Sequence, residues 1–430
     1  MPEEELPAFG CEFPMQDTKL YQRLLGIQAP WQVDGVDIDV KNVREGTVTV
    51  SVSHDRAVPL PCPECGADCP GYDTRERRWR HLDTMQYRTI LVAQVPRVRC
   101  PTHDVRQVDV PWAEQGSRFT ALFEMLVIDW LQEASFAAVA RRLNMTWDQV
   151  AGVQDRAVER GLARRDLTKP KAIGVDETSF KKGHDYVTVV NDLDAPGHVL
   201  HVADGRRQGA LDEFFEVLGE DGAQGLEHVA MDMWPAYIKS TERNAPQADI
   251  VFDKFHIAKH LGDAVDKVRR SEHKALTAQG DHRLKKTKHL WLRNPENMSS
   301  SRWRDFAGLR KSELKVARAW AIKEMAMSLW GYRKRGWAER MWKRWYQWAI
   351  RCRLEPMKRV ARMIKAHWEG VMNAVTSPIT NARAEGINRK IQWIKRKACG
   401  FRNRERFRMA IYFHLGGLDL YPAKASGAHT

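Results

Sequence analysis

The order of short apolar segments between residues 172 and 253 constrains the fold more than any other feature of the chain. Three segments with strand-like patterns come first, and a turn at Gly183 makes a hairpin of the first two. The amphipathic helical pattern GALDEFFEVL follows, and two more apolar runs come after it, the last at residues 248–253. The chain therefore predicts an α/β unit with the order strand, strand, strand, helix, strand, strand.

Two aspartates stand at or near the ends of strands in this unit. Asp176 follows the apolar run that contains Ile173 and Val175, and Asp232 follows the run that ends in Met231. The strand order is that of an RNase H-like sheet, in which the first two acids lie on adjacent central strands and a third arrives on a later helix. Three carboxylates so placed can hold two Mg²⁺ ions about 4 Å apart, the geometry for in-line attack on a phosphodiester.

Residues 381–403, NARAEGINRKIQWIKRKACGFRN, offer the third acid. Apolar residues recur there at helical spacing and predict a buried stripe that ends before a stop at Gly400. Glu385 falls on another, polar face, where a carboxylate among cations that suit a phosphate backbone indicates a metal ligand held against nucleic acid. A solvated Glu paired with Arg389 is the alternative. The stripe consists of Ile387, Ile391, Ile394 and Ala398, and the polar face of Glu385, Asn388, Gln392, Lys395 and Arg396.

The chain resembles the DDE transposases of bacterial insertion sequences, and most closely the ISL3 family. The segments that carry the resemblance are VDE (175–177), MDMW (231–234), FDKFH (252–256) and residues 381–403. Together with the amino-terminal modules discussed next, they extend the resemblance over nearly the whole chain.

The resemblance implies a catalytic triad of Asp176, Asp232 and Glu385 that holds Mg²⁺ or Mn²⁺. It also implies that Asp253 and His256 are accessory residues with a structural or supporting role. Asp253 is the one competitor for the second acidic position.

Two cysteine motifs, CPEC at 62–65 and CPTH at 100–103, form half-sites separated by a predicted strand hairpin. Cys62, Cys65, Cys100 and His103 suit a tetrahedral, structural Zn²⁺ site, although Cys69 stands close enough to compete as a ligand. In the resembled family such a module precedes a helix-turn-helix, and the final His here departs from the commoner Cys. The other thiols, expected to be reduced, are Cys11, Cys352 and Cys399.

Residues 135–162 carry a helix-turn-helix pattern. Ser135 can cap a first short helix, Asn144 suits the turn, and Thr146 can cap a second helix. The first turn of that second helix, with Thr146, Trp147 and Gln149, would then face the major groove of DNA. A plain helical bundle has the same apolar spacing, and the position between a zinc module and a nuclease-like core favours the DNA-binding interpretation.

Charge is distributed unevenly along the chain. Residues 254–430 contain 41 Lys and Arg against 14 Asp and Glu, whereas residues 1–253 contain 28 against 41. The basic half is the better candidate for phosphate contact, and its expected DNA-binding residues are Asn388, Lys390, Lys395, Arg396 and Arg402.

A helix-rich insertion is expected within the basic half. Its tryptophans could stack on DNA, but the spacing favours the core of a helical bundle with a basic outer face. These tryptophans are Trp337, Trp342, Trp345 and Trp348.

We therefore expect a multidomain α/β chain with an RNase H-like mixed sheet. Its expected parts are a flexible tail (1–15), a zinc module (16–111), a helix-turn-helix domain (112–165), a catalytic domain (166–256 and 376–416), the Trp-rich helical insertion (257–375) and a C-terminal tail (417–430).

The expected function is that of a transposase that binds the terminal inverted repeats of its element, as double-stranded DNA, and pairs them as a homo-oligomer. A DNA-binding regulator and a nuclease without strand transfer remain alternatives. The start, MPEEELPAF, is not a signal peptide, and no apolar run reaches the ~18 residues of a membrane span, so we expect a protein of the bacterial cytoplasm at the nucleoid.

Overall fold

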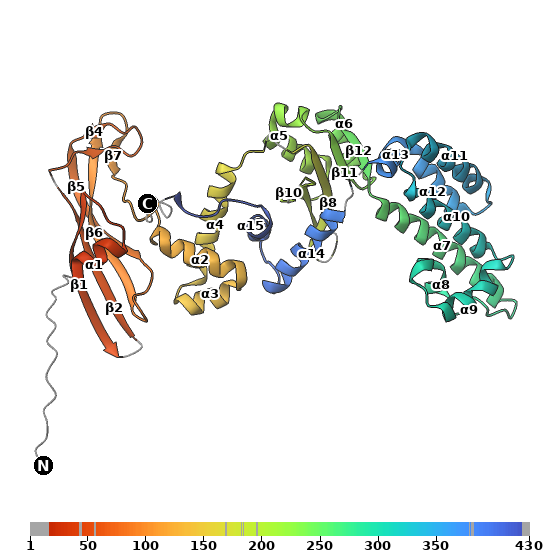
Figure 1. Ribbon diagram of the computed structural model, residues 1–430, viewed down its shortest axis with the longest axis horizontal. Helices are drawn as coiled ribbons and strands as arrows, with labels where there is room; N and C mark the ends of the chain where they lie inside the picture. Colours follow the sequence, from red (N-terminus) through yellow and green to blue (C-terminus); the bar gives the residue numbers. More distant parts are fainter. Residues whose placement is uncertain are drawn as a thin grey trace, which may run out of the picture. The chain divides into compact units, whose positions relative to one another are not determined.

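The computed structural model describes residues 17–42, 45–55, 57–167, 170–181, 183, 185–194, 197–377, 379 and 382–423, except for the side chains of Ala382, Arg383 and Glu385. The expected tail at residues 1–15, with Cys11, lies outside this part. The chain divides into two compact units, one of Met1–Arg165 with Leu418–Thr430 and one of Asp166–Gly417 (Figure 1). None of the described helices is long and apolar enough to cross a membrane.

The first unit begins with a helix and a five-stranded mixed sheet. The strands run in the order β1–β2–β6–β5, with β7 along β6, and only the β2–β6 pair is parallel. The predicted hairpin between the cysteine motifs is confirmed as β5 and β6, whereas α1, β1 and β2 have no counterpart in the sequence predictions. The elements are α1 (Asp17–Leu24), β1 (Trp31–Asn42), β2 (Glu45–His54), β3 (Leu60–Pro61), β4 (Asp68–Cys69), β5 (Gly71–Arg80), β6 (Arg88–Cys100) and β7 (Asp104–Gln107).

Three buried tryptophans form the centre of this sheet's core. Trp112 meets Trp31 and Trp79 edge to face, with ring centres 5.0 and 5.5 Å apart. This is the geometry that aromatic quadrupoles prefer, and it adds to the hydrophobic gain of burying the rings. Just after β5, His81 Nδ1 lies 2.9 Å from the Thr120 hydroxyl, which also caps α2.

His81 makes the first unit sensitive to acid. Burial and then the neighbouring Arg80 lower the pKa of His81 to about 4, whereas an unfolded histidine titrates near ~6.5. The unfolded chain therefore binds a proton more readily, and this stability, complete above pH ~6.5, falls by up to about 3 kcal/mol as the pH drops towards 4. Hydrogen exchange of first-unit amides measures this effect. Between pH 7 and pH 5, the free energy of protection should fall less in His81→Asn than in the wild type. Equal losses in both proteins would contradict this assignment.

The helix-turn-helix prediction is confirmed in α2 (Ala121–Glu133), α3 (Phe136–Leu143) and α4 (Trp147–Arg164). Ser135 caps α3, and Asn144 takes the left-handed conformation, with φ of 49°. Thr146 and Gln149 form a capping box at the start of α4, because each side chain accepts from the other's backbone N–H.

The C-terminal segment packs on α4 through residues 418–421, within the tail that was expected from residue 417. Arg160 donates to the carbonyl of Leu420, and Arg164 pairs with Asp419 at 2.7 Å. The chains approach closely because position 161 is glycine; a Cβ there would meet the Leu418 side chain at 2.6 Å.

The second unit contains the predicted RNase H-like sheet. Its strands lie in the order β10–β9–β8–β11–β12; the first three are antiparallel, and β8, β11 and β12 are parallel. Helices α5 and α6 alternate with β11 and β12, and α14 and α15 complete the unit (Figure 1). The elements are β8 (Ala172–Lys181), β9 (Asp185–Asp192), β10 (Val199–Asp204), α5 (Gln208–Gln224), β11 (His228–Met231), α6 (Pro235–Asn244), β12 (Asp249–Phe252), α14 (Ala382–Lys397) and α15 (Arg404–Leu415).

The chain between β12 and α14 forms the predicted helical insertion. Trp342 and Trp345 are fully buried in it, which confirms the bundle-core interpretation for these two, whereas Trp337 and Trp348 are 55% and 39% exposed. The helices are α7 (Lys254–Thr277), α8 (Lys288–Leu292), η1 (Pro295–Asn297), α9 (Ser300–Lys311), α10 (Lys315–Ser328), η2 (Leu329–Gly331), α11 (Arg335–Arg351), α12 (Glu355–Ala366) and α13 (Trp368–Thr376).

Candidate active site

Three aspartates align across the three parallel strands, with Asp232 and Asp253 directly after β11 and β12 and Asp176 within β8. The prediction that Asp176 lies at or near the end of its strand is wrong, because β8 continues to Lys181 along β9. Ala230 of β11 pairs with Gly174 of β8 on one side and with Val251 of β12 on the other. Two residues beyond these positions stand Asp176, Asp232 and Asp253. The alignment continues past the last paired residues, because the Asp253 N–H donates to the Met231 carbonyl at 3.0 Å. The acids of the first and fourth strands are therefore neighbours, as the strand order predicted, and Asp253 extends the row.

Asp176 is half-buried, and both of its carboxylate oxygens have donors. Oδ1 accepts from the Glu177 N–H at 2.7 Å, and Oδ2 accepts from Asn388 Nδ2 at 2.6 Å. Burial raises the pKa of Asp176 to about 6, against the lowering effects of the Glu177 N–H and of nearby His256. These two donors hold the carboxylate in one orientation. A cation beside it would stabilise the ionised form, which burial disfavours.

Helix α14 lies along β8 through three polar side chains spaced one turn apart. Besides Asn388, Gln392 donates to the Thr178 hydroxyl at 3.1 Å and Lys395 Nζ donates to the Ser179 carbonyl at 2.7 Å. Burial lowers the pKa of Lys395. Asn388 and Lys395, expected on a DNA-facing surface, thus join α14 to β8, because that polar face packs on a strand whose end carries polar groups.

The side chain of Glu385 lies outside the described residues, as does Asn381. The backbone at position 385 is in the first turn of α14, three residues before Asn388. Residues three apart share a helix face, so position 385 is on the face that Asn388 turns to β8. The predicted end of the helix is confirmed by φ of 93° at Gly400, but Ala398, expected in the buried stripe, lies beyond Lys397 and is exposed.

Asp253 and His256 form a connected pair beside Asp232. Asp253 is 6% exposed and caps α7, with its Oδ1 accepting from the Phe255 N–H at 2.9 Å. His256 Nδ1 lies 3.3 Å from Asp253 Oδ2, and its Nε2 lies 3.8 Å from Asp232 Oδ2. Asp253, above all, raises the pKa of His256, which favours the imidazolium between the two carboxylates.

His367 is a residue near the site that sequence reasoning missed. It follows α12, and its ring meets Phe252 edge to face at 5.3 Å. Burial lowers the pKa of His367, and the carboxylate of Asp232 opposes this effect. The helical insertion thus brings a second histidine into the surroundings of Asp232, and no motif marks it in the sequence.

The four predicted zinc ligands lie together in the first unit. The ligand atoms of Cys62, Cys65, Cys100 and His103 are all within 4.8 Å of one another. His103 Nδ1 is 3.7 Å from the Cys62 sulfur and 3.5 Å from the Cys100 sulfur. The chain therefore gathers three thiols and one ring nitrogen, a donor set that suits Zn²⁺.

Two residues next to this cluster, Glu64 and Cys69, differ in their relation to the ligands. Glu64 lies 3.7 Å from His103 Nε2 and is itself paired with Arg106 at 2.5 Å, so the second ring nitrogen of His103 faces a fixed carboxylate. Cys69 stands outside the four-residue group, and its Sγ donates to the Ala67 carbonyl at 3.3 Å.

The predicted DNA-reading residues stand at the start of α4. Trp147 is 48% exposed, with its ring 5.3 Å from that of Phe136. Gln149 is exposed too, but its Oε1 accepts from the Thr146 N–H at 2.9 Å. Gln149 therefore has a structural role in addition to the predicted one.

Three of the cations predicted to contact DNA have exposed side chains: Lys390, Arg396 and Arg402.

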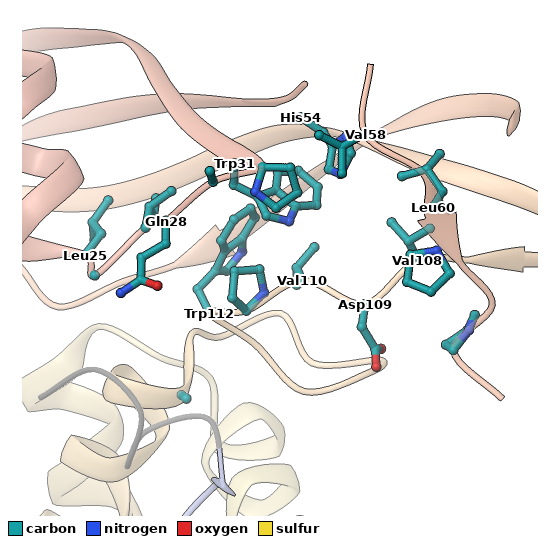
Figure 2. Close-up of a pocket in the computed structure, with 18 of the residues that line it drawn as sticks. Leu25, Gln28, Trp31, His54, Val58, Leu60, Val108, Asp109, Val110 and Trp112 are labelled. Carbon is teal, nitrogen blue, oxygen red and sulfur yellow. The ribbon is translucent and has the colours of Figure 1, made fainter. Parts of the chain in front are cut away.

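A cavity of about 870 Å³ belongs to the first unit, where Trp31, Trp112 and Val110 line it (Figure 2). Its lining includes none of the three aspartates.

Three consecutive parts of the chain match family models. Residues 59–103 match the zinc finger of the transposases of IS204, IS1001, IS1096 and IS1165, and residues 108–158 match the helix-turn-helix domain of transposase family ISL3. Residues 173–411, more than half of the chain, match the ISL3 transposase domain. The chain belongs to the ISL3 family of transposases. Its expected fold, with zinc module, helix-turn-helix and catalytic core, is confirmed.

Relatives of this transposase extend over almost its full length. It is 29% identical over 404 residues to the transposase for insertion sequence element IS1001 of Bordetella parapertussis, covering 92% of this chain and 98% of the relative. It is 28% identical over 419 residues to the transposase for insertion sequence element IS1557 of Mycobacterium tuberculosis, covering 90% and 93%. The enzyme is thus a DNA transposase with a DNA-binding helix-turn-helix domain, and its zinc finger supports a structural Zn²⁺.

Proposed function

We propose that this transposase binds the terminal inverted repeats of its own insertion sequence through the zinc and helix-turn-helix modules and pairs them as a homo-oligomer. It then cleaves and joins DNA strands at Asp176, Asp232 and Glu385, in the bacterial cytoplasm where chromosomal DNA lies. The observation that carries the proposal is the alignment of Asp176 and Asp232 on adjacent parallel strands, with α14 held against β8 by Asn388.

The donor groups around Asp176 fit a hard divalent cation, because carboxylate and amide oxygens are its preferred ligands. Asn388 Oδ1 is buried, and among the described groups it has no hydrogen-bond partner. Asp176, Asp232 and Glu385 would hold Mg²⁺ or Mn²⁺, which would polarise the scissile phosphate and lower the pKa of the attacking water.

The protein's own groups orient the reacting carboxylates. The Glu177 N–H and Asn388 fix Asp176, and the Met233 N–H holds Asp232 Oδ1 at 2.6 Å. In cleavage, a water oxygen attacks the scissile phosphorus and a 3′-hydroxyl leaves. In strand transfer, that 3′-hydroxyl attacks a target phosphodiester and a target 3′-oxygen leaves, without a covalent protein–DNA intermediate.

Asp253 and His256 support this site in the proposal. The buried Asp253 carboxylate caps α7 and holds His256, whose imidazolium offsets negative charge beside Asp232. Asp253 therefore fixes the neighbouring helix, while Asp232 serves as the second member of the triad.

Labelled element ends, incubated with the protein and a plasmid target in Mg²⁺ or in EDTA, test the function. Products that join the end to the plasmid, formed in Mg²⁺ and absent in EDTA, are expected. Nicks alone would indicate a nuclease without strand transfer, and a mobility shift without any cleavage would indicate a regulator.

The two DNA-facing surfaces should contribute differently to binding. Trp147→Ala should reduce discrimination of the terminal repeat over random DNA, because Trp147 lies where a recognition helix meets bases. A combined Lys390→Ala and Arg396→Ala change should weaken binding to all DNA and flatten the salt dependence by roughly two units of slope. Titrations at several salt concentrations measure both effects.

Gln149→Glu is a second test of the recognition surface that leaves the helix start intact, since Glu also completes a capping box and keeps α4 capped. A changed sequence preference in this variant would then report on DNA contact rather than on helix stability. The division of roles is wrong if Lys390→Ala with Arg396→Ala changes sequence preference while Trp147→Ala and Gln149→Glu leave it intact.

A further inference from the structure

A cation held between two aromatic rings adjoins the acids. The guanidinium of Arg206 lies 5.0 Å from the centre of the Tyr186 ring and 4.7 Å from that of Trp234. Its Nη1 is 3.5 Å from Glu177, the residue after Asp176, and Trp234 is two residues after Asp232. This cluster of Tyr186, Arg206 and Trp234 is thus tied in sequence and in space to the first two acids.

Trp234 is held in place although its ring remains open to solvent. Its Nε1 donates to the Arg206 carbonyl at 2.9 Å, and it stands immediately before α6. The side chain is nevertheless 37% exposed, unlike the fully buried Trp342 and Trp345. An indole fixed by its N–H and covered by a guanidinium on one face contributes little to the core, and its remaining surface suits a planar ligand.

We propose that Trp234, supported by Arg206, stacks on a base that leaves the DNA duplex next to the scissile phosphate. An unpaired base presents a π-face that an exposed aromatic ring can cover, and a nearby cation favours the accompanying phosphates. Strand cleavage also requires the backbone at the scissile phosphate to reach carboxylates at the end of a sheet, which is easier for an unstacked nucleotide. The inference rests on the proposed function, since it assigns the cluster to the same DNA strand.

The helical insertion provides a matched control. Arg340 lies 4.7 Å from the centre of the Trp337 ring, the same distance as in the Arg206–Trp234 pair, and Trp337 is 55% exposed. Trp337 belongs to α11 and is remote in sequence from the acids. Its replacement removes an equivalent exposed indole without removing the one beside Asp232.

Photo-crosslinking locates the base. Element ends carrying one 5-iodouracil, at each position within a few nucleotides of the cleavage site, should crosslink to Trp234 from one position. Trp234→Ala should cleave unmodified ends about ten- to a hundredfold more slowly, as expected for loss of one base–aromatic stack. Trp234→Phe, which keeps a ring but not the N–H, should restore most of the rate, and Trp337→Ala should cleave like the wild type.

An abasic site at the crosslinked position separates stacking from a folding defect. With no base to stack, the wild type and Trp234→Ala should cleave at equal rates, whereas a misfolded variant would stay slower. Cleavage by the wild type, but not by Asp176→Asn, establishes that cleavage of the same substrates depends on the triad. The stacking role is overturned, and the proposed function stands, in either of two cases. Trp234→Ala could cleave unmodified ends at the wild-type rate, or it could remain slower than the wild type by the same factor on the abasic end. No Mg²⁺-dependent cleavage by the wild type would overturn both.

Discussion

Asp→Asn at 176 or 232, or Glu→Gln at 385, is expected to lower cleavage and strand transfer by several orders of magnitude while binding to element ends survives. Each change keeps the size of the side chain and removes the negative charge needed to hold Mg²⁺. Binding can tighten slightly, because a carboxylate that faces phosphates repels them. Repeat binding and Mg²⁺-dependent cleavage, measured on the same preparations, separate the two effects.

Asp253→Asn is the informative control for the triad. Asn can still cap α7 but loses the charge that faces the His256 ring, so the replacement should reduce cleavage only in part and lower stability by at most about 1 kcal/mol, the scale of a partly exposed ion pair. If Asp253 instead belongs to the triad, its variant should match Asp232→Asn in cleavage. Near-normal cleavage by Glu385→Gln would refute the proposed mechanism.

The sheet could be predicted because its strands are short apolar runs in a distinctive order. Gly183 marks the first hairpin, and Asp176 and Asp232 follow the apolar runs that become neighbouring strands, although β8 continues past Asp176 to Lys181. The level of Asp253 was harder to foresee, since it depends on the β11–β12 register. A one-residue shift of that register would turn the Asp253 side chain to the other face of the sheet. The apolar pattern of the two strands does not determine their register.

Helical spacing identified faces but could not name their neighbours. The polar face of α14 was correctly separated from the apolar stripe. Its packing on β8 through Asn388 and Lys395, however, depends on the tertiary structure. His367 was missed for the same reason, because a helical insertion returns it to Asp232 from more than a hundred residues away. In α11 the same spacing contains both the buried Trp342 and the exposed Trp337.

The packing of the C-terminal segment on α4 left only a small trace in the sequence. Gly161 interrupts a helix where alanine would be more favourable by about 1 kcal/mol. Its missing side chain makes room for Leu418, more than 250 residues later in the chain. A glycine within a helical pattern can therefore indicate a close approach, but the partner becomes known only from the structure.

Cys65→Ser is expected to release about one Zn²⁺ per chain and to unfold the zinc module. The ligand atoms of Cys62, Cys65, Cys100 and His103 converge from two loops that strands β5 and β6 separate in sequence, so the ion links the short β3–β4 hairpin to the end of β6. Structural Zn²⁺ sites contribute on the order of 10 kcal/mol, more than such a module can lose and stay folded.

Cys69→Ser is the matched control for this prediction, because Cys69 is a buried thiol a few residues from the ligands but outside their group. It should keep full zinc content and repeat binding. His103→Cys should also keep zinc, since a thiolate can replace the ring nitrogen, although it loses the contact with Glu64. Metal analysis, limited proteolysis of the first unit and binding to element ends measure the three variants together. Full zinc occupancy in Cys65→Ser, or loss of zinc in Cys69→Ser, would show that the ligand set is a different one.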